Sequence, residues 1–82
     1  MKTAEDLRAT VLSVLAEIAP EADAASVDPA ESLRQQLDLD SMDFLNFVIG
    51  LHKRLGVEIP ESDYSRLASV DGAITYLSAK QS

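Results

Sequence analysis

A serine flanked by aspartates is the segment of this 82-residue sequence best suited to chemistry. Asp40 is a preferred N-cap residue for the apolar segment that follows, and Asp43, three positions later, can complete a capping box. Ser41 then occupies the first helical position, and its hydroxyl is not needed to cap the backbone. We therefore expect a free, exposed hydroxyl at the start of a helix. The simpler alternative is that Ser41 is itself the cap or an ordinary surface serine.

The sequence provides no partner that could make Ser41 a catalytic nucleophile. Such a serine needs a base within hydrogen-bond reach. The only histidine, His52, lies eleven positions further along the same predicted helix, about 16 Å away at about 1.5 Å per residue. The glycines of a nucleophile elbow are also missing. We expect no catalytic residue, so any modification of Ser41 requires another enzyme.

A metal site is not expected either. The chain has no cysteine and one histidine, which excludes thiolate sites and sites built on several imidazoles. A calcium loop beginning at Asp38 would place Met42, Asp43 and Ile49 where a ligand, a glycine and a bidentate glutamate are required.

The formal net charge of -7 disfavours binding to nucleic acid and to anionic membranes, and it favours partners with basic patches. The apolar run Val11 to Ala16 is too short for a signal peptide or a membrane span. We expect one domain over residues 1–82, in the cytoplasm and without membrane insertion.

Helical periodicity and capping residues indicate the elements that position Ser41. No segment alternates with period two for long enough to form a sheet, so the fold is predicted to be all-α. A long connection over residues 20–39 should contain one helical turn, with Leu33 and Leu37 attached to the core. The predicted helices cover about Thr3–Ala19, Ser41–Leu55, Ser62–Leu67 (a short helix) and Val70–Ala79, with Gly56 ending the second and Ser69 capping the last.

The second of these helices has two apolar faces. One comprises Phe44, Phe47, Val48, Leu51 and Leu55, which is the expected core stripe. Almost opposite lie Met42, Leu45 and Ile49, here called the apolar ridge. Either the other helices bury both faces, or the ridge is exposed and binds partners together with Asp43 and Asn46 beside it.

The segment "LDLDSMDFLNFVIGLHKRLGVEIPESDY" resembles the phosphopantetheine attachment region of acyl carrier proteins. Asp40-Ser41-Met42 stands where that family has Asp-Ser-Leu, and residues 57–60 match its "VEIP" segment. Residues 67–77, "LASVDGAITYL", resemble its final helix. The resemblance implies a small helical bundle of three main helices plus one short helix, with a long loop between helices 1 and 2.

The resemblance also implies a function. Ser41 would carry 4′-phosphopantetheine, attached by a phosphopantetheinyl transferase (a holo-acyl-carrier synthase), with Asp40 as the motif residue before it. The arm would hold acyl groups as thioesters for acyl-transferring and condensing enzymes of fatty-acid, polyketide or related lipid synthesis. The carrier is expected to be a monomer. The family commonly shelters the acyl chain between helices, and Phe44, Phe47 and Ile59 are the candidate lining.

Three positions depart from the family pattern. Asp38 replaces a glycine, and aspartate can adopt a left-handed conformation at some cost. Met42 replaces leucine. Basic and neutral residues dilute the acidity of the second helix, since residues 1–40 hold nine of the fourteen acidic side chains and only three of the seven basic ones. This favours a specialised carrier.

Two other functions stay open on the sequence. An aminoacyl or peptidyl carrier would share the same attachment motif, and a helical interaction domain without a prosthetic group would need no attachment site.

Asp40 and Asp43 would repel an attached phosphate, and we expect them to turn the arm toward solvent.

Overall fold

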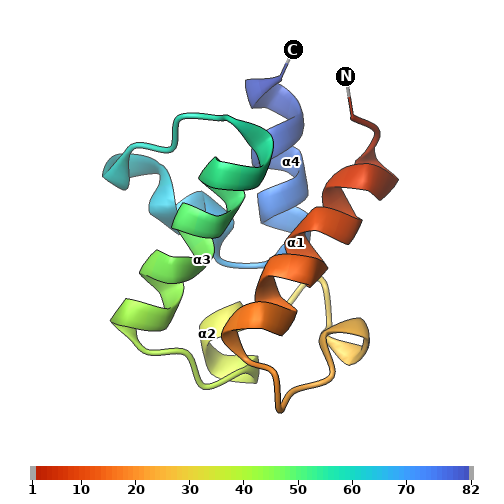
Figure 1. Ribbon diagram of the computed structural model, residues 1–82, viewed down its shortest axis with the longest axis vertical. Coiled ribbons are helices and arrows are strands. Elements are labelled where there is room, and N and C mark those ends of the chain that lie inside the picture. The colour runs from red at the N-terminus through yellow and green to blue at the C-terminus, as the bar shows by residue number, and fades with distance from the viewer. Residues whose placement is uncertain (1, 82) are drawn as a thin grey trace.

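The computed structural model describes residues 2–81 and confirms an all-α bundle (Figure 1). Three main helices, α1, α3 and α4, pack together, and shorter helical turns lie in the connections. The side chain of Gln81, which follows the last helix, accepts a hydrogen bond from the backbone N–H of Lys2 at 3.2 Å, so the two ends of the described chain are adjacent. The elements are α1 (Ala4–Ile18), the 3₁₀ helix η1 (Ala24–Ser26), α2 (Leu33–Gln36), α3 (Ser41–Leu55), the 3₁₀ helix η2 (Glu61–Leu67) and α4 (Val70–Lys80).

Each main helix begins after a capping residue, and Asp40 and Ser69 hold the capping positions predicted for them. Thr3 and Asp6 form a capping box at the start of α1, and the backbone N–H of Thr3 lowers the pKa of Asp6. Ser69 accepts from the backbone N–H of Gly72 at the start of α4. Helix α1 ends at Ile18, one residue before the predicted end, ahead of the helix-breaking Pro20.

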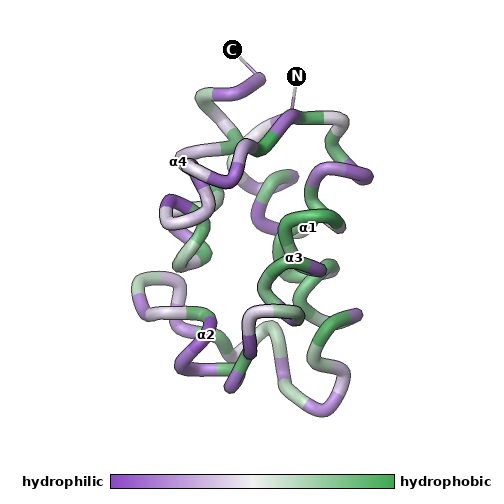
Figure 2. Tube along the Cα trace, turned by 90° about the vertical axis from the view of Figure 1, so that its left-hand side faces the viewer, coloured by the Kyte–Doolittle hydropathy of each residue, from purple (hydrophilic) through white to green (hydrophobic). Residues whose placement is uncertain are grey.

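The core lies between α1, α3 and α4, and α1 contacts both of the other helices. The hydrophobic stretches of α1 and α3 lie side by side (Figure 2). Gly50 in α3 allows this close approach, since a Cβ there would lie 2.7 Å from Val14 Cγ1. The fully buried side chains of the three helices include Leu7, Val11, Leu15, Phe47, Leu51, Val70, Ala73 and Leu77.

The long connection between α1 and α3 is more ordered than predicted. It contains η1 as well as the expected helical turn, which is α2. As predicted, Leu33 is fully buried and the half-buried Leu37 packs against the core, and Val27 and Leu39 are buried as well. The backbone N–H of Leu33 donates to the carbonyl of Ala68 at 2.8 Å, so α2 is attached to the segment between η2 and α4.

The C-terminal half follows the prediction with two differences. The short helix before α4 is a 3₁₀ helix that begins one residue earlier, at Glu61, and α4 continues to Lys80. Gly56 adopts the left-handed conformation (φ 66°) that ends α3. No helix in residues 2–81 has the length and apolar character required to cross a lipid bilayer.

A buried tyrosine links η2 to α4. The hydroxyl of Tyr76 donates to the Asp63 carboxylate at 2.6 Å. Burial, and then this hydrogen bond, raise the pKa of Tyr76 to about 12, above its ordinary value of 10. The folded protein therefore holds this proton more tightly than the unfolded chain does.

This link predicts a loss of stability at high pH. Because the unfolded chain releases the Tyr76 proton first, the free energy of unfolding should decline from about pH 10 upward, toward the folded pKa of about 12. Tyr76→Phe should cost about 1 kcal/mol at neutral pH through the lost hydrogen bond, and it should remove this part of the decline. Urea unfolding from pH 8 to 11 measures both. A difference between wild type and variant that stays constant across this range would contradict the assignment.

Candidate functional site

The start of α3 has the capping geometry predicted from the sequence. The Asp40 carboxylate accepts the backbone N–H of Asp43 at 2.8 Å, and the Asp43 carboxylate accepts the backbone N–H of Asp40 at 3.3 Å. Asp38, two residues earlier, adopts the left-handed conformation (φ 53°) expected where the resembling family has glycine. These contacts place Ser41 at the first position of α3.

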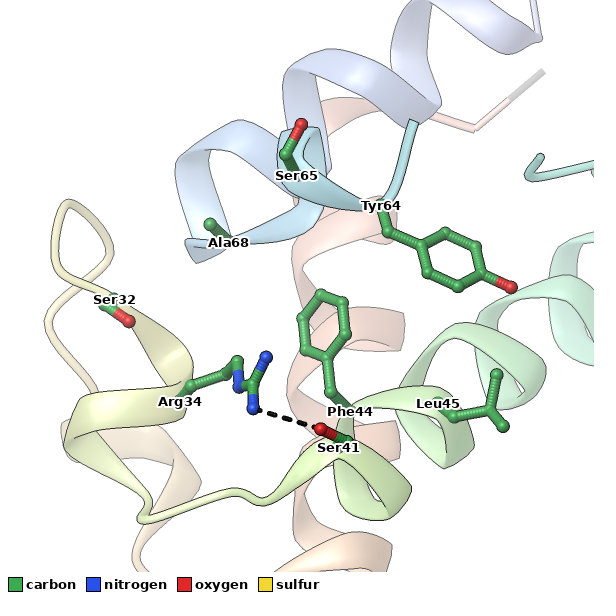
Figure 3. Close-up of a pocket in the computed structure, with 8 residues that line it drawn as sticks. All are labelled: Ser32, Arg34, Ser41, Phe44, Leu45, Tyr64, Ser65 and Ala68. Atoms are coloured by element: carbon green, nitrogen blue, oxygen red, sulfur yellow. Dashed lines mark hydrogen bonds between the residues drawn. The ribbon is translucent and has the colours of Figure 1, made fainter. Parts of the chain in front are cut away.

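Ser41 is exposed, and its hydroxyl makes no capping bond to the backbone. The prediction of an entirely free hydroxyl is nevertheless wrong in one respect. Arg34, on α2, donates from Nη2 to Ser41 Oγ at 3.5 Å, a long hydrogen bond (Figure 3). The hydroxyl is therefore accessible, with a guanidinium at its side.

Arg34 is the site residue that the sequence analysis missed. Its guanidinium carbon also lies 5.8 Å from the centroid of the Phe44 ring, within cation–π range. A signal was present in the sequence, since Arg34 is the only lysine or arginine between Arg8 and Lys53. Its approach to Ser41, however, depends on where α2 packs, and periodicity does not specify that.

The hydrogen bonds of the described residues connect Ser41 to no general base. His52 faces the end of α3 instead, where its Nδ1 lies 2.7 Å from the carbonyl oxygen of Val57. Within residues 2–81, no three His, Asp or Glu side chains are grouped so that they could hold a metal ion. The site therefore presents an exposed hydroxyl at the start of α3.

A pocket of about 440 Å³ opens beside Ser41, between α2, α3 and η2. In Figure 3 the rings of Phe44 and Tyr64 stand in the space between α3 and η2, and Arg34 reaches across from α2. The two rings meet in an edge-on contact, with centroids 6.4 Å apart. The lining residues are Ser32, Arg34, Ser41, Phe44, Leu45, Tyr64, Ser65 and Ala68.

Of the three residues expected to shelter an acyl chain, Phe44 lines the pocket beside Ser41. Phe47 is fully buried in the core and does not line the pocket. Ile59 lines a different, smaller pocket at the other end of α3. Helical periodicity places a residue on a face, but the neighbouring segment that covers each part of that face is decided by tertiary packing.

The apolar ridge is exposed, which excludes the alternative in which both faces of α3 are buried. The exposed fractions are 65% for Met42, 37% for Leu45 and 39% for Ile49, and these are the exposed large hydrophobic side chains of the described chain. Beside them Asp43 is half-buried and Asn46 is exposed. Of the opposite stripe, Phe44, Phe47, Val48 and Leu51 are buried as predicted, and Leu55 is half-buried.

The sequence matches a family model described as a phosphopantetheine attachment site over residues 6–77. Curated relatives include acyl carrier proteins from two bacteria. The one from Micrococcus luteus is 32% identical, with a match covering 87% of this chain and 91% of the relative. The one from Campylobacter hominis is also 32% identical, over 94% of this chain and 91% of the relative.

The fold is similar to that of the acyl carrier protein from Enterococcus faecalis. The TM-score is 0.80, and the superposition covers 96% of this chain and 99% of the other. Because the sequences are only 23% identical, this similarity concerns the fold alone.

The capping geometry predicts how substitutions at Asp40 affect stability. Asp40→Ala should lower the free energy of unfolding by about 1 kcal/mol, since the backbone N–H of Asp43 loses its acceptor. Asp40→Asn should retain most of that stability, because asparagine caps about as well. Urea unfolding followed by circular dichroism measures both. Equal losses in the two variants would show that the negative charge, and not the cap, is what matters.

Proposed function

The chain belongs to the acyl carrier protein family, and from this premise we propose that Ser41 is the residue that carries its 4′-phosphopantetheine arm. One observation supports the assignment above all: Ser41 presents an exposed hydroxyl at the first position of α3, while Asp40 takes the capping role. A serine that capped the helix would have its oxygen engaged by the backbone.

The residues around Ser41 fit the group. A phosphodiester carries negative charge, and both the guanidinium of Arg34 and the first-turn N–H groups of α3 are donors that favour an anion. When bound, the arm supplies a terminal thiol that holds acyl groups as thioesters. This accounts for thiol chemistry in a chain that has no cysteine.

The attachment step needs a transferase, because Ser41 has no base of its own. The Ser41 hydroxyl gives its proton to a base on the transferase, and its oxygen bonds to the phosphorus next to the pantetheine of coenzyme A. The pyrophosphate bond breaks, and adenosine 3′,5′-bisphosphate leaves. This chain contributes an accessible oxygen and a capped helix that holds it outward, and it is proposed to be a carrier rather than a catalyst.

The apolar ridge is proposed as the surface that binds partner enzymes. Met42, Leu45 and Ile49 are exposed on the helix that begins with Ser41, so a docked enzyme would meet the arm and the ridge together. Asp43 and Asn46 add polar groups at its edge. The proposed partners are the phosphopantetheinyl transferase and the acyl-transferring and condensing enzymes of fatty-acid, polyketide or related lipid synthesis.

We propose that the carrier acts as a monomer in the cytoplasm. The absence of cysteine is compatible with a reducing compartment. In the described chain the ridge consists of three exposed large hydrophobic side chains. This patch is small for the interface of a stable dimer.

Loading with a transferase tests the attachment site. Incubation of the apo protein with coenzyme A and a broad-specificity transferase should add one phosphopantetheine by intact mass, and Ser41→Ala should abolish the gain completely. Ser62→Ala, at another exposed serine, is the matched control and should load like wild type. A wild type that gains no mass while a reference carrier is modified would favour a helical interaction domain without a prosthetic group.

Charge substitutions on the ridge test partner binding. Met42→Glu or Leu45→Glu should lower kcat/KM of a partner enzyme for the loaded carrier by about tenfold, because a buried interface anchor typically contributes more than about 1 kcal/mol. Ala16→Glu adds the same charge at an exposed position on α1 and should have little effect. Circular dichroism verifies folding. Equal rates for all three variants would rule out the ridge as the docking surface.

A further inference from the structure

We propose that Arg34 binds the phosphodiester of the arm and holds it at the mouth of the pocket between α2, α3 and η2. The inference rests on the proposed attachment at Ser41. It assigns a binding role to a residue outside the attachment motif, on a helical turn that the long connection brings to the start of α3.

The reach of Arg34 is the first support. Its Nη2 already lies 3.5 Å from Ser41 Oγ, the atom that would become part of the phosphodiester. The phosphorus is bonded directly to that oxygen, and its two unesterified oxygens project beyond it. A guanidinium at this distance can exchange a long hydrogen bond to a neutral hydroxyl for charge-assisted bonds to those oxygens.

The charge of Arg34 is not committed elsewhere. Within residues 2–81, the one ion pair joins Arg54 and Glu17. Arg54 also donates to the hydroxyl of Ser13. Arg34 has no carboxylate within ion-pair distance, and its contacts are the Ser41 hydroxyl and the face of the Phe44 ring. An exposed arginine without an acidic partner, in a chain of net charge -7, is available for an anionic ligand.

The backbone that carries Arg34 is held in place from two sides. Ser32 caps the turn by accepting from the backbone N–H of Gln35. Leu33 is fully buried, and its N–H donates to the carbonyl of Ala68 at 2.8 Å. Arg34 thus stands next to a core residue on an anchored turn, so binding requires its side chain to be ordered but not its backbone.

The neighbouring carboxylates make a cation favourable beside an attached phosphate. Asp40 and Asp43 flank Ser41 and would repel an attached phosphate, although each accepts a backbone N–H of the other residue. Arg34 offsets this repulsion on the side of the pocket. The arm would therefore leave Ser41 along the pocket mouth, in contrast to the sequence-based expectation that the acidic pair turns it away into solvent.

The test compares loaded proteins by phosphorus NMR. Wild type, Arg34→Gln, Arg34→Lys and the control Arg8→Gln, an exposed arginine on α1, are each loaded to completion as judged by intact mass. We expect the ³¹P resonance of Arg34→Gln to be displaced from that of wild type, with Arg8→Gln unchanged and Arg34→Lys displaced less. Salt at about 1 M should move the wild-type resonance toward that of Arg34→Gln, because exposed charges are then strongly screened.

A second readout follows the arginine itself. On loading, the exchange of the Arg34 side-chain N–H protons with solvent should slow severalfold in wild type. The two proposals fail in different ways. No mass gain on wild type refutes the attachment site, whereas full loading with the same ³¹P resonance in wild type and Arg34→Gln, and no slowing of exchange, overturns the role of Arg34. A displacement in Arg34→Lys as large as in Arg34→Gln would also overturn it, because positive charge would then not be the cause.

Discussion

The cap that Asp40 provides for α3 is the interaction on which the site depends. The first N–H groups of any helix have no intrahelical acceptor, and a nearby serine oxygen is among the usual ways to satisfy one of them. Here the Asp40 carboxylate does so at 2.8 Å, and Asp43 completes the box. The consequence is that Ser41 keeps its hydroxyl available at an exposed helix start.

The long connection between α1 and α3 provides the second feature of the site. A loop of this length in a small domain is uncommon unless it is functional. Here it carries α2, and two long-range backbone bonds attach the connection to the start of α4: the N–H of Leu33 donates to the carbonyl of Ala68, and the N–H of Asp71 donates to the carbonyl of Pro29. In this position α2 brings the guanidinium of Arg34 to the beginning of α3 and forms one wall of the pocket. The connection therefore links the stability of the core to the electrostatics at Ser41.

Features set by local interactions were predictable from the sequence. The bounds of α3, its capping box and its glycine stop follow from side chains within a few positions of each other. The second apolar face of α3 was also predictable, but whether it is exposed was left open by the sequence and is decided by the structure. Even the left-handed conformation of Asp38 could be anticipated, because the motif requires it and aspartate tolerates it.

Features set by packing between distant segments could not be predicted. The contact between Arg34 and Ser41 depends on the position of α2 against the start of α3, and the bond between Tyr76 and Asp63 depends on the position of η2 against α4. The same reason explains why the sequence did not indicate that Tyr64 lines the pocket beside Ser41.

The proposed function depends on Ser41 being the sole acceptor of the arm, and peptide mapping of the loaded protein tests this most directly. Trypsin cleavage after Arg34 and Lys53 releases residues 35–53, in which Ser41 is the single serine. The account predicts that the phosphopantetheine is found on this peptide alone, and its presence on a peptide that contains any other serine would contradict it.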